Sequence, residues 1–70
     1  MQIDVGAFGY WEFEIFKKTK RGEATNIIKS HYEVLEADAK NVLLGDGQKE
    51  LIVTRRRIIK FEKKDKPDKY

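Results

Sequence analysis

The sequence predicts an all-β protein: one small, five-stranded, strongly bent barrel that ends in a disordered basic tail. The first reason is size, because a chain of 70 residues buries only about 60% of its unfolded surface. Without cysteine it has no disulfides to add stability, so it needs a compact sheet rich in large apolar residues. The second is the alternation of apolar and acidic side chains within residues 10–16, which is typical of a half-buried strand. The third is the pair Asp46-Gly47 between two apolar runs, a strong hairpin signal.

The chain divides into three segments. Residues 1–9 contain two glycines and no sustained period, so we expect an N-terminal lead-in there. Residues 10–62 form the single barrel domain. Residues 63–70 are highly charged and hold the only proline, which predicts a flexible tail.

Two long strands are expected in the first part of the barrel. Residues 10–16 form the first, and residues 17–23 follow as a polar, basic loop. Residues 24–37 form the second strand, but their apolar side chains fall on both faces. A flat strand cannot bury both sets on one side, so we expect the strand to bend sharply near Ser30-His31, for example through a bulge, and to switch its faces there.

The remaining elements are short. They are a turn over 38–41, a strand over 42–44, a hairpin turn over 45–48, a strand over 50–54, a 3₁₀ turn over 55–57 and a strand over 58–62. The competing interpretation is a helix over 32–44, where Tyr32, Leu35 and Ala39 could line one face and a glutamate stands four residues before a lysine.

Positive charge is gathered in clusters. The net charge is +3, and residues 63–70 contribute +2 of it, so the chain is not the uniformly basic kind that coats a duplex. Two clusters stand out: Arg55, Arg56 and Arg57 in the expected 3₁₀ turn, and Lys17, Lys18, Lys20 and Arg21 in the expected loop. Guanidinium groups bind phosphates bidentately and stack on bases. The alternative is that both clusters are solvated turns, the arginines also deterring strand-edge pairing.

Two stretches of the C-terminal half resemble the motifs of the Sm-like (Hfq-like) family of small barrels. They are Ala37-Asp38-Ala39-Lys40-Asn41-Val42-Leu43-Leu44-Gly45-Asp46 and Glu50-Leu51-Ile52-Val53-Thr54-Arg55-Arg56-Arg57-Ile58-Ile59. The resemblance implies an SH3-like or Sm-like barrel in a six- or seven-membered ring, whose two turns grip single-stranded, often uridine-rich RNA. Asp38, Lys40 and Asn41 would then occupy the first RNA-facing turn, and Arg55 and Arg56 the second.

We therefore expect a non-enzymatic binding protein that forms homo-oligomers and binds single-stranded nucleic acid, RNA in preference. Tyr32 is added to the expected site as a stacking surface, with Lys20 and Arg21 as further phosphate contacts. His31 is the only histidine and has no partner base or nucleophile at useful spacing. No phosphate loop, zinc spacing or nucleophile motif occurs, so no enzyme activity, cofactor or metal is expected.

Other functions remain open. The chain could be a protein-interaction module, such as a phage-encoded inhibitor or adaptor of a host protein that pairs through a strand edge. A pocket at a subunit interface could instead capture a small anionic nucleotide. The sequence lacks a run of about 18 apolar residues and a secretory signal, so we expect no membrane contact and a cytoplasmic location.

Overall fold

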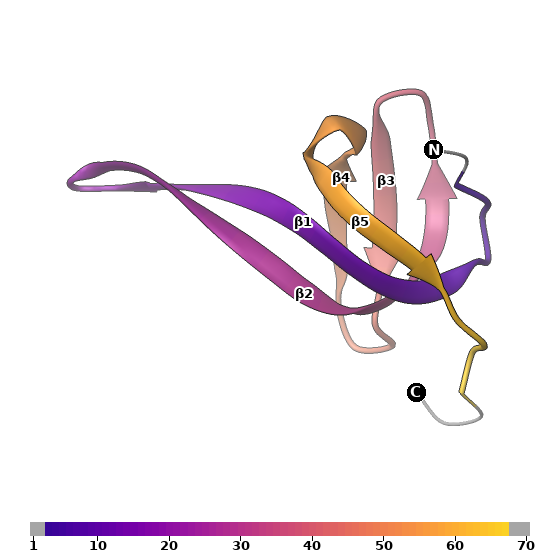
Figure 1. The fold of residues 1–70 in the computed structure, drawn as a ribbon. Coiled ribbons are helices and arrows are strands. Elements are labelled where there is room, and N and C mark those ends of the chain that lie inside the picture. Colours follow the sequence, from indigo (N-terminus) through magenta and orange to yellow (C-terminus); the bar gives the residue numbers. More distant parts are fainter. Residues whose placement is uncertain (1–2, 68–70) are drawn as a thin grey trace.

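The computed structural model describes residues 3–67, which form one antiparallel sheet of five strands with the order β4-β3-β2-β1-β5 (Figure 1). The elements are β1 (Phe8–Thr19), β2 (Gly22–Ala37), β3 (Asn41–Gly45), β4 (Glu50–Thr54), the 3₁₀ turn η1 (Arg55–Arg57) and β5 (Ile58–Lys63). The all-β prediction is confirmed, and the alternative helix over 32–44 is wrong. Within the described residues β4 and β5 are the two sheet edges and do not pair with each other, so the sheet is open and the predicted barrel is not confirmed.

Strand β2 changes its buried face near its end. The β1–β2 ladder is unbroken from Phe8 opposite Glu33 to the tip, so the bulge expected at residues 30–31 is wrong. The irregularity lies in the β2–β3 pairing, between Val34 and Glu36. Val34 is fully buried, Glu36 is exposed, and Ala37 again packs against the core. One extra residue therefore lets β2 bury apolar side chains of both parities.

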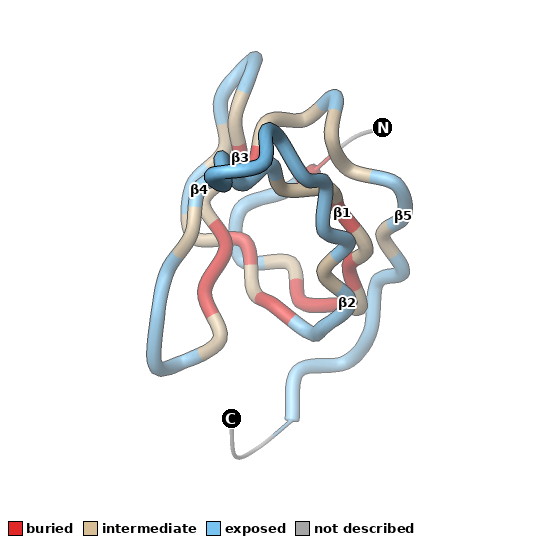
Figure 2. The backbone as a smooth tube through the Cα atoms, turned by 90° about the vertical axis from the view of Figure 1, so that its left-hand side faces the viewer, coloured by how far each residue is buried: buried red, intermediate tan, exposed pale blue. Residues whose placement is uncertain are grey.

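The core lies inside the curved sheet, where strands far apart in the sequence contribute buried residues (Figure 2). Its members are Ile3, Trp11, Phe13, Tyr32, Val34, Val42, Leu44 and Val53. The Trp11 ring is fully buried and stacks on Phe61 with centroids 4.1 Å apart. Its Nε1–H donates to the Tyr32 carbonyl oxygen at 3.2 Å, so the indole buries its area without leaving a donor unpaired.

The N-terminal segment belongs to the domain and is not a separate lead-in. Gly6 N–H donates to the Val34 carbonyl at 2.8 Å, and Val34 N–H donates to the Ala7 carbonyl at 2.8 Å. Ile3 is buried, and β1 begins at Phe8. The ordered part of the sheet therefore starts several residues earlier than residue 10, where the sequence predicted the first strand.

The expected tail is also attached at its start. Lys63 is the last residue of β5, Lys64 N–H donates to the Phe8 carbonyl at 2.9 Å, and Lys66 Nζ lies 2.8 Å from Glu33 Oε1. The tail therefore starts after Lys63 and not at it, its first residues lie along the sheet, and residues 68–70 lie outside the described part of the chain.

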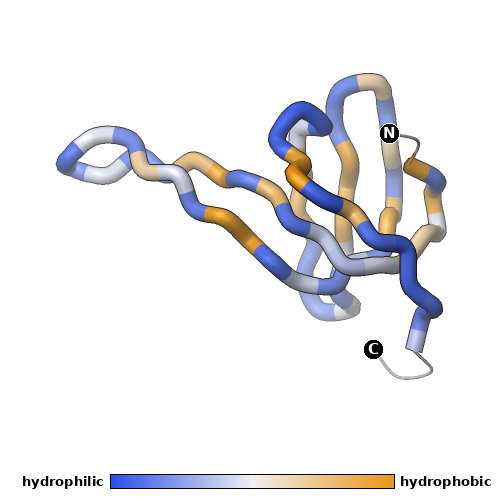
Figure 3. Tube along the Cα trace, viewed as in Figure 1, coloured by the Kyte–Doolittle hydropathy of each residue, from blue (hydrophilic) through white to orange (hydrophobic). Residues whose placement is uncertain are grey.

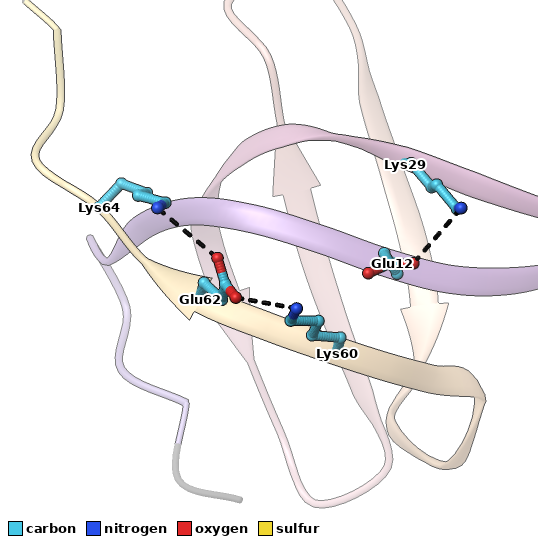
Figure 4. Close-up of polar contacts among 5 residues, drawn as sticks. All are labelled: Glu12, Lys29, Lys60, Glu62 and Lys64. Atoms are coloured by element: carbon cyan, nitrogen blue, oxygen red, sulfur yellow. Dashed lines mark ion pairs between the residues drawn. The ribbon is translucent and has the colours of Figure 1, made fainter.

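Ion pairs lie along β5 and between β1 and β2 (Figure 4). Lys60 Nζ and Lys64 Nζ lie 2.9 and 3.6 Å from the Glu62 carboxylate, and Lys29 Nζ lies 3.8 Å from Glu12 Oε1. The hydrogen bond and charge of Lys60 lower the pKa of Glu62, and Glu62 raises the pKa of Lys60 by the same contact. Because these groups are solvated, such pairs contribute little to stability.

Strands β1 and β2 continue past the rest of the molecule as a two-stranded hairpin (Figure 1, left). We call residues 16–27, all exposed, the arm, and the other described residues the body. The strands pair as far as Thr19 and Gly22, so the loop expected over residues 17–23 is reduced to Lys20 and Arg21. Figure 3 shows that the end of the arm is hydrophilic.

Candidate nucleic-acid interface

Two turns that are distant in sequence are joined by hydrogen bonds at the start of η1. Arg55 N–H donates to the Lys40 carbonyl oxygen at 2.8 Å. Arg55 Nε–H donates to the Asp38 carbonyl oxygen at 2.7 Å. The structure thus brings together the two turns that the sequence predicted as one binding site.

The turn at residues 38–41 is shaped by its aspartate. Asp38 Oδ1 accepts hydrogen bonds from the backbone N–H groups of Lys40 at 2.8 Å and Asn41 at 2.7 Å. These two bonds, first that of Asn41, lower the pKa of Asp38, and the charges of Arg55 and Lys40 act in the same direction. Asp38 is therefore an ionised turn former, as predicted from the turn chemistry of aspartate.

A pocket of about 570 Å³ lies between the turn and η1, lined by Ala39, Lys40, Asn41, Thr54, Arg55 and Arg56. Asn41 and Thr54 are opposite each other on β3 and β4. The Thr54 hydroxyl donates to Asn41 Oδ1 in a long hydrogen bond of 3.4 Å. The amide oxygen is thereby engaged, and the amide nitrogen is left as a hydrogen-bond donor.

The three consecutive arginines do not act on one surface. Arg55 is held on the turn, and Arg56 is exposed at the pocket. Arg57 places its guanidinium 3.8 Å from the centroid of the Phe16 ring, a cation–π contact, and lines another hollow beside Ile52. Successive residues of a tight turn point in different directions, so Arg57 is not brought to the pocket.

Three other predicted site residues also lie elsewhere. Lys20 and Arg21 form the tip of the arm, which is remote from η1 (Figure 1). Tyr32 is only 5% exposed, with its ring centroid 5.9 Å from that of Phe13. The prediction of Tyr32 as a stacking surface is wrong, because its position on β2 faces the core. Sequence reasoning missed Thr54, whose role depends on the β3–β4 register and has no local signal.

The lining of the pocket supplies hydrogen-bond donors and positive charge. Among residues 3–67, no three histidine, aspartate or glutamate side chains gather as metal ligands. The same residues include no helix long and apolar enough to cross a membrane. Comparisons with known proteins find no matching family model, no similar curated protein and no similar solved structure.

Proposed function

We propose that this protein binds single-stranded nucleic acid, RNA in preference, in the pocket between the 38–41 turn and η1. The observation that carries the proposal is the double attachment of Arg55 to the carbonyls of Asp38 and Lys40. This attachment uses the Arg55 Nε–H and holds the side chain beside the pocket, so its terminal guanidinium nitrogens remain for a ligand.

The lining groups suit a nucleotide. Lys40, Arg55 and Arg56 supply positive charge for a phosphate, and the Asn41 amide supplies a donor for a base edge. The pocket lies within the usual size of small-molecule sites, roughly 300–1,000 Å³. No aromatic ring lines it, so a base would stack on a guanidinium plane.

A single strand is favoured because only an unstacked base can be turned out into such a pocket. RNA is favoured because the turns that form the pocket are those that resemble the RNA-gripping turns of the Sm-like family. The proposed role is binding alone, with no reaction at the site.

Fluorescence anisotropy with a labelled uridine-rich RNA and its DNA counterpart tests the proposal. For single strands, each phosphate contact contributes about 0.7 to the slope of log affinity against log salt. Arg56→Gln should lower that slope by about 0.7, and Asn41→Ala should weaken binding without changing it. Lys49→Gln, an exposed lysine in the other aspartate turn, removes the same charge and should have little effect.

Two results would contradict the proposal. One is that neither oligonucleotide binds the unaltered chain at low salt. The other is that Lys49→Gln weakens binding as much as Arg56→Gln, which would indicate general attraction to the protein surface.

A second candidate function is association through the sheet edges, favoured by two exposed side chains. Ile52 on β4 is 72% exposed and Ile59 on β5 is 52% exposed, and both strands are edges of the described sheet. An exposed apolar edge pairs readily with another strand. Pairing β4 of one copy with β5 of the next is head-to-tail and forms a ring if the rotation closes.

The mass in solution tests self-association. An oligomer that dissociates with Ile52→Lys supports pairing between copies of this chain. A monomeric chain that retains one partner protein from its host after nuclease treatment supports an adaptor role. A monomer with no partner contradicts both.

A further inference from the structure

The arm extends beyond the core and pairs with no third strand of the described sheet. Strand β5 pairs with β1 only between Gly9 and Phe13, and β3 pairs with β2 only between Glu33 and Ala37. The arm therefore has two strands and no third. An isolated two-stranded hairpin is marginally stable in water, so an exposed arm of this length calls for a functional explanation.

The arm is the most basic part of the chain. Its cations are Lys17, Lys18, Lys20 and Arg21, and its one acidic residue is Glu23. The resulting charge of +3 equals that of the 70-residue chain, so all other residues together balance to zero. None of the four cations takes part in an ion pair within the described residues.

The tip has a defined shape. The Thr19 hydroxyl donates to the Gly22 carbonyl oxygen at 2.9 Å and accepts the Arg21 N–H at 3.3 Å. Gly22 has a φ of +119°, which glycine adopts without strain. Lys20 and Arg21 are thus presented on a short, bonded turn at the far end of the ribbon.

The two-stranded form of the arm and its length suit the major groove of a B-form duplex. That groove is about 12 Å wide and 8.5 Å deep and admits a two-stranded β-ribbon. At about 3.4 Å per residue, the strand from Phe16 to the tip is roughly 17 Å long, so the ribbon is long enough to lie along the groove with its side chains near the flanking phosphates. Lys17 and Lys18 are successive strand residues and point to opposite faces, so an inserted ribbon offers a cation to both sides.

We propose that the arm docks in the major groove of double-stranded DNA, with its four cations on the phosphates. The exposed large apolar side chains of the arm, Phe16 and Ile27, lie at its base. The residues between Lys17 and Glu23 include none, which disfavours insertion of the tip into a membrane. The major groove of an RNA duplex is too narrow and deep for side chains to read. This site is separate from the pocket at η1, and the proposal does not rest on the function proposed there.

A labelled DNA duplex titrated at several salt concentrations tests the arm. Four phosphate contacts predict a slope of about −3.6 in log affinity against log salt, or about 150-fold weaker binding between about 50 and 200 mM salt. The double variant Lys20→Gln/Arg21→Gln should reduce the slope by about 1.8. The matched control, Lys49→Gln/Lys63→Gln, removes two exposed body lysines and should leave the slope nearly unchanged.

The other probes separate groove docking from its alternatives. A charge-preserving variant, Lys20→Arg/Arg21→Lys, should retain duplex binding, and circular dichroism shows whether each variant keeps its β structure. No duplex binding at low salt would overturn the proposal, as would equal binding of a DNA duplex, an RNA duplex and heparin. If Arg56→Gln loses single-strand binding but keeps duplex binding, the loss is due to the pocket, and the result supports two separate sites.

Discussion

In β1, the Phe13 ring is fully buried in the body, whereas the Phe16 ring, in the arm, is 51% exposed. Both residues belong to the same unbroken β1–β2 ladder. Backbone pairing is therefore common to the two regions, and burial is what separates them. Outside its own ladder and turn, the arm is tied to the body by the contact of Phe16 with Arg57. Strand pairing can thus extend a hairpin well beyond the core from which it starts.

The largest expected effect is on the buried phenylalanine. Phe13→Ala removes a fully buried ring and should lower the free energy of unfolding by about 3–5 kcal/mol, enough to unfold many small domains. Phe16→Ala removes a half-exposed ring and its cation–π contact and should cost about 0.5–1 kcal/mol. Urea denaturation followed by circular dichroism measures both, and similar losses in the two variants would show that the arm shares the core.

The second-largest effect is expected from adding a side chain to a glycine of the body, Gly9. A Cβ on Gly9 would lie 2.2 Å from the Glu62 carbonyl oxygen and 2.5 Å from the Phe61 ring, so Gly9→Ala must push β5 away from β1. We expect a loss of about 1–3 kcal/mol in the free energy of unfolding.

In the arm, the comparison is Gly22→Ala. A Cβ there meets nothing within 4 Å, but its φ of +119° strains any L side chain. Since the arm can open locally, this strain should loosen the tip and leave the thermal midpoint of the body almost unchanged. Hydrogen exchange resolves the two regions, and a large fall in the body's midpoint for Gly22→Ala would contradict the separation.

The smallest expected effect is in acid and belongs to the body. Backbone N–H bonds lower the pKa of Asp38 in one turn and of Asp46 in the other. A carboxyl whose pKa is lower in the folded state stabilises the fold above its unfolded pKa, and this stabilisation is lost as the pH falls through the folded value. We therefore expect a decline in thermal stability below about pH 4, less steep in Asp38→Asn and in Asp46→Asn.

The two aspartates also form a matched pair. Of the two aspartate turns, the Asp38 turn is the one joined to η1. Asp38→Asn should therefore change how oligonucleotide affinity depends on pH in the acid range, and Asp46→Asn should leave that dependence unchanged. An unchanged pH profile in both variants would show that neither carboxylate carries the acid dependence.

The features that could be predicted from sequence are those fixed by neighbours in the chain. Asp46-Gly47 sits in a turn whose aspartate accepts two backbone N–H bonds, Asp38 does the same, and residues 55–57 form the expected 3₁₀ turn. The Asp38 turn and the 3₁₀ turn form the two halves of the pocket.

The remaining features depend on strand register, which the sequence does not display. The extra residue in β2 lies between Val34 and Glu36, in the pairing with β3, and not at residues 30–31. The same register buries Tyr32 and places Thr54 beside Asn41. The length of the arm was also missed, because basic side chains in residues 17–23 are as typical of a loop as of a solvated ribbon.

The unequal placement of charge has a kinetic consequence. Because the arm holds a charge of +3 at one end of a molecule 42 Å long, the charge of the molecule is unevenly distributed along its length. The field of a polyanion then exerts a torque on the approaching molecule as well as an attraction, and turns the hairpin tip to the front before first contact. Such steering raises the rate of productive collisions and fades with ionic strength.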